Sequence, residues 1–144
     1  MLLLGFIAPS GVVAQEIRYE DDKLTVSDSA WRDYFGRVLA IDGDWAIIGA
    51  IGDDDGGSES GSAYVFHYDG AAWIEYEKLL AHDGKASHGF GYAISLAGES
   101  AAIGANHWAE KERGIDCGAM YLFRFNGSNW TEEAAPVRRG LRLR

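Results

Sequence analysis

The sequence predicts an all-β fold built from two similar units, each a four-stranded antiparallel sheet. Three observations support this prediction. The 144 residues include 19 glycines but only 2 prolines, a balance typical of short strands joined by many tight turns. Short apolar runs are separated by turn signals such as the Asp69–Gly70 pair. Residues 23–77 recur, with their signature residues in the same order, as residues 78–134.

The repeat is specific because identical residues keep their order in both units. Lys23 recurs as Lys78, 55 positions later, and this offset holds as far as Ala50 and Ala105. Past one loop the offset becomes 57, so the two extra residues of the second unit fall in a single place. Repeat proteins tolerate such insertions in loops on one face. The recurring positions include Asp28/Asp83, Phe35/Phe90, Gly36/Gly91, Gly49/Gly104, Tyr64/Tyr121, Phe66/Phe123, Trp73/Trp130 and Glu75/Glu132.

Each unit is expected to contribute four strands, which in the first unit span residues 37–41, 45–50, 62–68 and 73–79. The second run is apolar throughout, which indicates a strand buried on both faces. The third run alternates, and the fourth carries glutamates, which suits an outer edge. An inner strand buried on both sides and a charged outer strand describe a β-propeller blade, so the sequence predicts two blades of a partial propeller.

The two ends of the chain depart from the repeat. Residues 1–14 are apolar and end in Val-Val-Ala, which predicts a signal-peptide remnant, with a hydrophobic amino-terminal strand as the alternative. Residues 15–22 resemble the outer strand of the first unit and are expected to form one, donated to the last blade to close a ring. Residues 135–144 form an atypical basic tail, interpreted as a truncated or frame-shifted reading, or alternatively as a binding tail.

Composition excludes several partners and chemistries. The net charge of −9 disfavours nucleic acid and anionic membranes, and no apolar run is long enough to span a bilayer. Cys117 is the single cysteine, so no intrachain disulfide is possible. No nucleophile elbow, phosphate loop or zinc pattern occurs in the sequence. We therefore predict no catalytic residues and no organic cofactor. Calcium is the one candidate metal ion.

The candidate metal ligands are Asp53, Asp55 and Glu59, which lie on a glycine-rich loop of the first unit. Several carboxylates on such a loop can gather a hard cation such as calcium. The alternative is a solvated acidic turn, because residues 106–113 of the second unit replace the loop with a nearly neutral stretch.

Some aromatic and polar residues stand outside the repeat pattern. Trp31 and Trp108 do not recur and fall in loops, where they serve either as exposed contact residues or as partly buried packing against a neighbouring blade. Asn126 and Asn129 occupy two Asn-x-Ser/Thr sequons, which are glycosylation candidates if the protein is secreted by a eukaryote.

A family resemblance rests on the recurring signatures. Phe35–Gly36 followed by Gly49–Ala50, and Phe90–Gly91 followed by Gly104–Ala105, resemble the FG-GAP repeat of integrin α heads and many secreted bacterial proteins. The resemblance covers residues 16–134 and implies a piece of an extracellular propeller, with further blades from the same or another chain.

The chain also departs from the family pattern. Ile51 and Asn106 stand where the family usually has proline after Gly-Ala. The integrin calcium loop would precede Gly-Ala, but residues 42–44 and 97–99 are too short to supply the six to eight oxygens that calcium prefers. The calcium site of the family is therefore not carried over by position.

Two function classes follow from these observations. The first is a non-catalytic module for binding or adhesion, secreted or held at the cell surface or in the periplasm, whose loops contact a protein or glycan. The second is an accessory or catalytic propeller domain of a secreted polysaccharide-acting enzyme. Fold alone does not choose between them.

Overall fold

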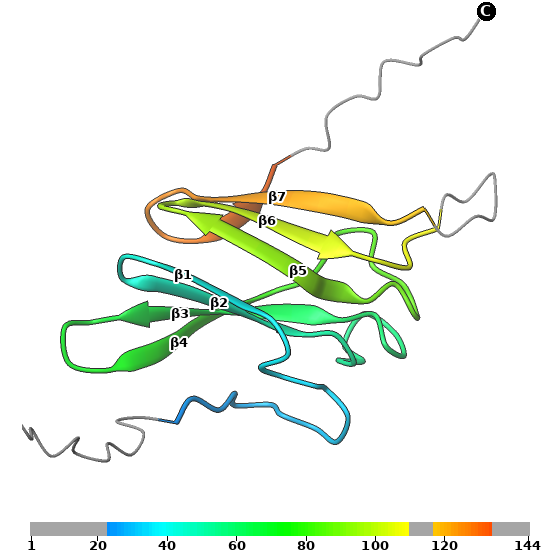
Figure 1. Ribbon diagram of the computed structural model, residues 1–144, viewed down its shortest axis with the longest axis horizontal. Helices are drawn as coiled ribbons and strands as arrows, with labels where there is room; N and C mark the ends of the chain where they lie inside the picture. Colours follow the sequence, from blue (N-terminus) through cyan, green and yellow to red (C-terminus); the bar gives the residue numbers. More distant parts are fainter. Residues whose placement is uncertain (1–22, 110–116, 134–144) are drawn as a thin grey trace, which may run out of the picture.

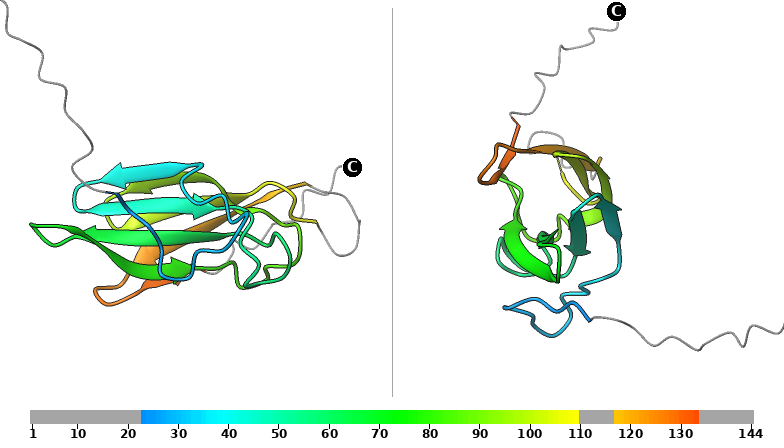
Figure 2. Two further views of the ribbon diagram at one scale, coloured as in Figure 1. Left: turned by 90° about the horizontal axis from the view of Figure 1, so that it is seen from below. Right: turned by 90° about the vertical axis from the view of Figure 1, so that its left-hand side faces the viewer.

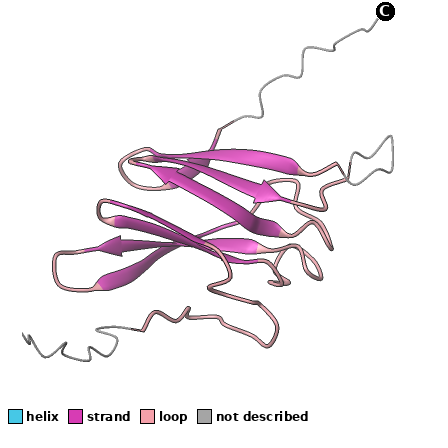
Figure 3. Ribbon diagram, in the orientation of Figure 1, coloured by secondary structure: helices cyan, strands magenta, loops and turns pink. Residues whose placement is uncertain are grey.

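The computed structural model describes residues 23–109 and 117–133, which form two four-stranded antiparallel sheets (Figure 1). The first sheet consists of β1 (Leu39–Asp42), β2 (Trp45–Ala50), β3 (Ser62–Tyr68) and β4 (Trp73–Leu79). The second consists of β5 (Phe90–Ala97), β6 (Ser100–Ala105), β7 (Ala119–Phe125) and β8 (Trp130–Glu132). Within the described residues there is no helix, which confirms the all-β prediction (Figure 3). The predicted signal remnant, amino-terminal outer strand and basic tail lie outside these residues.

The strand predictions for the first unit are confirmed for β2, β3 and β4, which have the expected bounds. The first strand was expected over residues 37–41, but β1 begins at Leu39. The reason lies just before it, where Arg37 donates its N–H back to the carbonyl of Tyr34, and Gly36 donates to Gly49. This turn keeps residues 36–38 out of the regular ladder.

The two units share their backbone conformation at matched positions, including several with positive φ. Gly36 and Gly91 have φ angles of 91° and 88°, and the hairpin glycines Gly70 and Gly127 have 98° and 94°. The correspondence extends to residues with side chains, since Arg32 at 72° matches Ser87 at 64°. The repeat seen in the sequence is therefore also a repeat in the backbone.

The two sheets stack on each other, with β5 lying against β1 and β2 (Figures 1 and 2). The core between them combines one face of the first sheet with the opposite face of the second. Fully buried Ile47 and Val65 come from the first sheet, while Phe90, Ile103 and Phe123 come from the second. Neither sheet covers this apolar surface alone, so its burial stabilises both together.

The other face of the first sheet is covered by the segment that precedes it, residues 23–38, which we call the first linker. Leu24, Val26 and Phe35 of this linker pack against Tyr64 and Phe66 of β3. The β2 strand is consequently buried on both faces, as predicted from its apolar run. Residues 80–89 form the equivalent second linker between β4 and β5.

The Phe-Gly and Gly-Ala signatures meet at the junction of the two sheets. Phe90 forms a parallel bridge with Gly61, and its N–H donates to the carbonyl of Ser60 at 2.9 Å. A Cβ built on Gly49 would overlap the carbonyl oxygen of Gly91, and one built on Gly91 would overlap that of Ser62. Glycine is required at both positions because the two backbones approach too closely for any side chain.

Candidate functional site

Each linker is fastened to its own sheet by two hydrogen bonds that recur in the repeat. Tyr64 donates its hydroxyl hydrogen to Asp28 at 2.7 Å, and Tyr121 donates to Asp83 at 2.6 Å. Carboxylate oxygens of the outer strand accept the second bond, from Ser27 N–H to Glu75 at 2.9 Å and from His82 N–H to Glu132 at 3.0 Å. These contacts explain why the aspartate, tyrosine and glutamate recur: they hold the fold.

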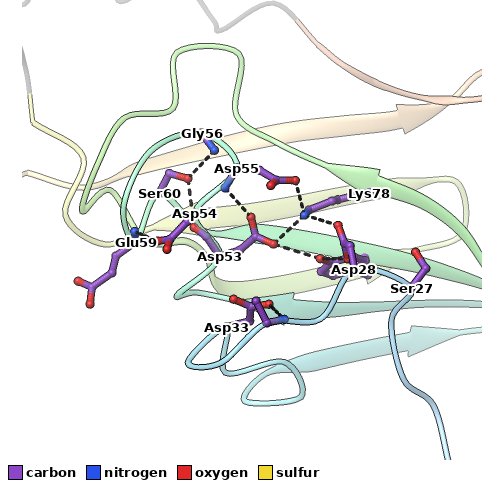
Figure 4. Close-up of polar contacts among 12 residues, drawn as sticks. Ser27, Asp28, Asp33, Asp53, Asp54, Asp55, Gly56, Glu59, Ser60 and Lys78 are labelled. Atoms are coloured by element: carbon purple, nitrogen blue, oxygen red, sulfur yellow. Dashed lines mark hydrogen bonds and ion pairs between the residues drawn. The ribbon is translucent and has the colours of Figure 1, made fainter.

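In the first unit this fastening carries an additional charged cluster (Figure 4). The Lys78 ammonium at the end of β4 lies 2.8 Å from Asp28, 2.7 Å from Asp53 and 2.6 Å from Asp55. Asp53 is almost fully buried, and its carboxylate also lies 3.1 Å from the hydroxyl of Tyr64. Three carboxylates thus converge on one ammonium at the base of the acidic loop.

The cluster shifts the pKa values of its members. Hydrogen bonding to Lys78, and then to Tyr64, holds the pKa of Asp28 below its ordinary value of 3.8. Burial opposes ionisation of Asp53, but the bonds from Lys78 and from the Asp55 N–H outweigh it and lower its pKa. Burial likewise opposes the charge on Lys78, but its three aspartate partners raise the lysine pKa. Asp28, Asp53 and Lys78 are therefore charged at neutral pH.

The structure brings together two of the three predicted calcium ligands. Oxygens of Asp53 and Asp55 lie within 4.8 Å of one another and of Asp28, while Glu59 is not part of this group. Lys78 occupies the position between the carboxylates that a divalent ion would need, so the residues present do not fit calcium while Lys78 remains there. Calcium binding by Asp53, Asp55 and Glu59 stays a prediction that this geometry disfavours.

A second feature is a groove of about 300 Å³ at the loop ends of the strands, where the two units meet. We call it the inter-unit groove. It is lined by pairs of residues that occupy equivalent positions in the repeat, so each unit contributes one half. These pairs are Tyr34/Gly89, Arg37/Tyr92, Ile51/Asn106 and Gly52/His107, and Glu59 and Ser87 complete the lining.

The groove is also where backbone strain gathers. Among the described residues, four that are not glycine have a positive φ angle. Three of these four, Tyr34, Glu59 and Ser87, line the groove. The left-handed conformation costs a residue with a Cβ roughly 1–2 kcal/mol. At Tyr34 the contrast is direct, because the equivalent residue of the second unit is Gly89, with φ of 65° against 54°. Residues with backbone strain of this kind are concentrated at binding and active sites.

The remaining sequence candidates separate in the structure. Trp31 is 82% exposed, with the Arg32 guanidinium 4.1 Å from its ring centroid. Trp108 instead packs against the core, and its indole N–H donates to Asp83 at 2.9 Å. It therefore has the packing role rather than the exposed one.

Asn126 and Asn129 are exposed, as the glycosylation hypothesis requires. Asn126 also has a structural use, because its side-chain oxygen accepts hydrogen bonds from the Ser128 and Asn129 N–H groups and closes the β7–β8 turn. Asp69 does the same in the first unit, with the N–H groups of Ala71 and Ala72. Glycosylation of either asparagine stays a prediction.

Comparison with protein-family models returns the FG-GAP repeat, matched twice, at residues 19–66 and 73–123. The two matches cover more than half of the chain and follow the period found in its sequence and backbone. The chain belongs to the FG-GAP repeat family. A comparison with curated proteins gives no match. The stacked four-stranded sheets are the blades of an FG-GAP β-propeller, and the Phe-Gly and Gly-Ala signatures are the residues that join one blade to the next.

For this FG-GAP protein, sequence reasoning missed Lys78, Asp28 and the inter-unit groove as site features. Asp28 recurs as Asp83, which marked it as important without revealing its partner. Tyr34 carried a usable signal, since it replaces the glycine found at the equivalent position of the other unit. In the described parts of the chain, no helix has the length and apolar character needed to cross a bilayer.

Proposed function

We propose that this chain is a non-catalytic, extracellular binding module in which the inter-unit groove holds a protein or glycan ligand. The proposal extends the family assignment, which provides the propeller-type repeat, to a specific surface. One observation supports the proposal. The groove is shared by two blades, and three of its lining residues, Tyr34, Glu59 and Ser87, have a strained backbone with positive φ. The second unit has Gly89 at the position of Tyr34, where a Cβ would overlap the Asn106 side chain, so the first unit is free to carry a side chain there, and contact with a ligand would account for its strained backbone.

The groove has the chemistry to recognise a polar ligand with flat apolar faces. Tyr34 and Tyr92 are large aromatic residues, each about half exposed, placed on the two sides. Arg37 and Glu59 add one charge of each sign, and Asn106 adds an amide. Aromatic anchors with a few polar groups are typical of sites for sugars and for peptide loops.

The test compares the wild-type chain with Tyr34→Gly on a printed array of glycans and extracellular proteins. Tyr34→Gly restores the residue used by the second unit, so it removes the aromatic ring while also relieving backbone strain. We expect the binding affinity to fall at least tenfold, which corresponds to about 1.4 kcal/mol of binding free energy. The melting temperature should be unchanged or higher. Trp31→Ala is the matched control, because it removes an exposed aromatic side chain of the same linker outside the groove.

Binding that survives in Tyr34→Gly, or that is lost equally in Trp31→Ala, would place the contact surface elsewhere. The catalytic alternative is checked on the same glycans, by measuring release of reducing ends. Turnover by the wild-type chain would replace the binding proposal with the enzymatic one.

A further inference from the structure

The first sheet has one face covered by the second sheet, and the equivalent face of the second sheet is exposed. In the first sheet, Ala63 and Val65 of β3 point toward the second sheet and are fully buried. Their counterparts in β7, Met120 and Leu122, are 68% and 40% exposed. Along β6 buried residues alternate with exposed or partly exposed ones, whereas β2 is buried from Ala46 to Ala50. The second sheet therefore has an open apolar face, formed by Ala102, Gly104, Met120 and Leu122.

This open face contains a hollow of the same kind that receives the Phe-Gly signature in the first sheet. This hollow is shallow and wide open to solvent, with a volume of about 530 Å³, and its lining includes Gly104, Gly118 and Met120. Their counterparts in the first sheet are Gly49, Gly61 and Ala63. It is against Gly49 and Gly61 that the Phe90–Gly91 backbone lies.

The chain also presents the surface that would fill this hollow. Phe90 is fully buried in the junction between the sheets, whereas its counterpart Phe35 is only half-buried. Ile94 of β5 packs against the shared core, whereas its counterpart Leu39 of β1 is 59% exposed. Ile41 is 59% exposed as well. We call Phe35, Gly36, Leu39 and Ile41 the leading face of the first sheet.

The two receiving faces have similar side-chain volume where the Phe-Gly signature docks, but at the other end of the strands Trp45 and His67 are exchanged for Ser100 and Arg124. Ile47 pairs with Val65 across β2 and β3, and the equivalent pair of the second sheet is Ala102 with Leu122. The larger Met120 stands where the first sheet has Ala63, which offsets the loss at Ala102. Volume-conserving exchanges of this kind preserve packing, and methionine adapts its shape readily.

We propose that a second copy of this chain docks its leading face onto the open face of the second sheet, repeating between chains the junction that joins the two sheets within one. The interface is head-to-tail, because the two contacting surfaces differ. Such an interface propagates until the ring closes, and propellers close with about four to eight blades.

The test uses two full-length variants, each with one face altered. Leu39→Glu/Ile41→Glu places charges on the leading face, and Met120→Glu/Leu122→Glu places them on the open face. All four side chains are exposed, so circular dichroism is expected to show unchanged folding. Leu80→Glu, in the linker between the sheets, controls for adding charge to an exposed apolar position outside both faces.

Light scattering after size-exclusion chromatography measures the mass of each species against the 15.7 kDa chain. We expect wild type and Leu80→Glu to be assemblies and each double variant to be a monomer. An equal mixture of the two double variants should form a one-to-one dimer, because each retains one working face. A monomeric wild type at all concentrations, a double variant that still dimerises alone, or a mixture that stays monomeric would each overturn the proposal. Ligand binding at the groove is not involved in any of these readouts.

Discussion

The hydroxyl of Tyr121 donates a 2.6 Å hydrogen bond to Asp83, 38 residues earlier in the chain. Tyr64 makes the equivalent bond to Asp28 at 2.7 Å. In each unit the tyrosine belongs to the third strand and the aspartate to the linker that enters the sheet. The Tyr121–Asp83 bond therefore fixes where the chain crosses from the first blade to the second, and this crossing sets how the two blades stack.

Removing one of these hydroxyl groups gives the first prediction. Tyr121→Phe leaves the half-buried Asp83 with Trp108 as its remaining side-chain donor. We expect a loss of about 1.5–3 kcal/mol in the free energy of unfolding, the range for hydrogen bonds to charged groups. Urea denaturation measures it. Tyr92→Phe is the control, since Tyr92 is exposed, and its effect should stay below about 0.5 kcal/mol.

The second prediction concerns the close approach of the two blades. Gly91→Ala forces a Cβ toward the Ser62 carbonyl at a φ of 88°, so both overlap and strain oppose it. We expect a loss of about 3 kcal/mol or more in unfolding free energy. Gly127 has a similar φ of 94° but open space around it, so Gly127→Ala measures the cost of backbone strain alone. We expect it to lower the unfolding free energy by about 1 kcal/mol. Equal losses for the two variants would mean that the blades do not meet at Gly91.

The charged cluster predicts a pH-dependent stability. The pKa values of Asp28 and Asp53 are lowered from 3.8 in the folded chain, so their contribution is present above that pH and is lost as the pH falls through the folded values. Lys78→Met removes the charge that keeps these carboxylates ionised. At pH 7 we expect it to cost about 2 kcal/mol, less than a fully buried pair because Asp28 and Asp55 are exposed.

Thermal unfolding from pH 7 down to about pH 3 checks this, because the difference between wild type and Lys78→Met should shrink as the carboxylates become protonated. A difference that stays constant over this window would show that Lys78 contributes by packing rather than by charge.

The same cluster makes a prediction about calcium. Because the Lys78 ammonium lies between the three carboxylates, millimolar calcium should leave the melting temperature of wild type unchanged. Lys78→Met frees those oxygens, and calcium should then raise its melting temperature. Adding Asp53→Asn and Asp55→Asn to Lys78→Met should abolish the rise. Calorimetric binding of calcium to wild type that disappears in Asp53→Asn would reverse this interpretation and support the acidic-loop hypothesis.

The strands were predictable because local chemistry sets them. The apolar run of β2, the alternation of β3 and the Asp69–Gly70 turn each act over a few residues, and the repeat places a related segment at each equivalent position of the second unit. The two-residue difference at β1 came from a turn that depends on the Gly36 N–H reaching the Gly49 carbonyl. Hydrogen bonds between residues that distant leave no local pattern.

The charged cluster illustrates why sites were harder to predict than strands. Asp53 and Asp55 were identified because they are neighbours in one loop of the sequence, but their main partner, Lys78, lies 23 residues beyond Asp55, on β4. Glu59 belonged to the same acidic run, yet the loop turns there with a φ of 54° and leaves it outside the cluster. Likewise, no pattern along the chain shows that one face of β6 lacks a neighbouring sheet.

The central claim is that neither blade is stable without the other, because they share one core. Native-state hydrogen exchange of Phe90→Leu tests it most directly. Phe90 is fully buried at the junction, and we expect the substitution to cost about 1–2 kcal/mol. The account predicts that the slowest amides of β2 and β6, one strand from each sheet, lose protection by the same free energy. A loss confined to β6, with β2 unchanged, would contradict it.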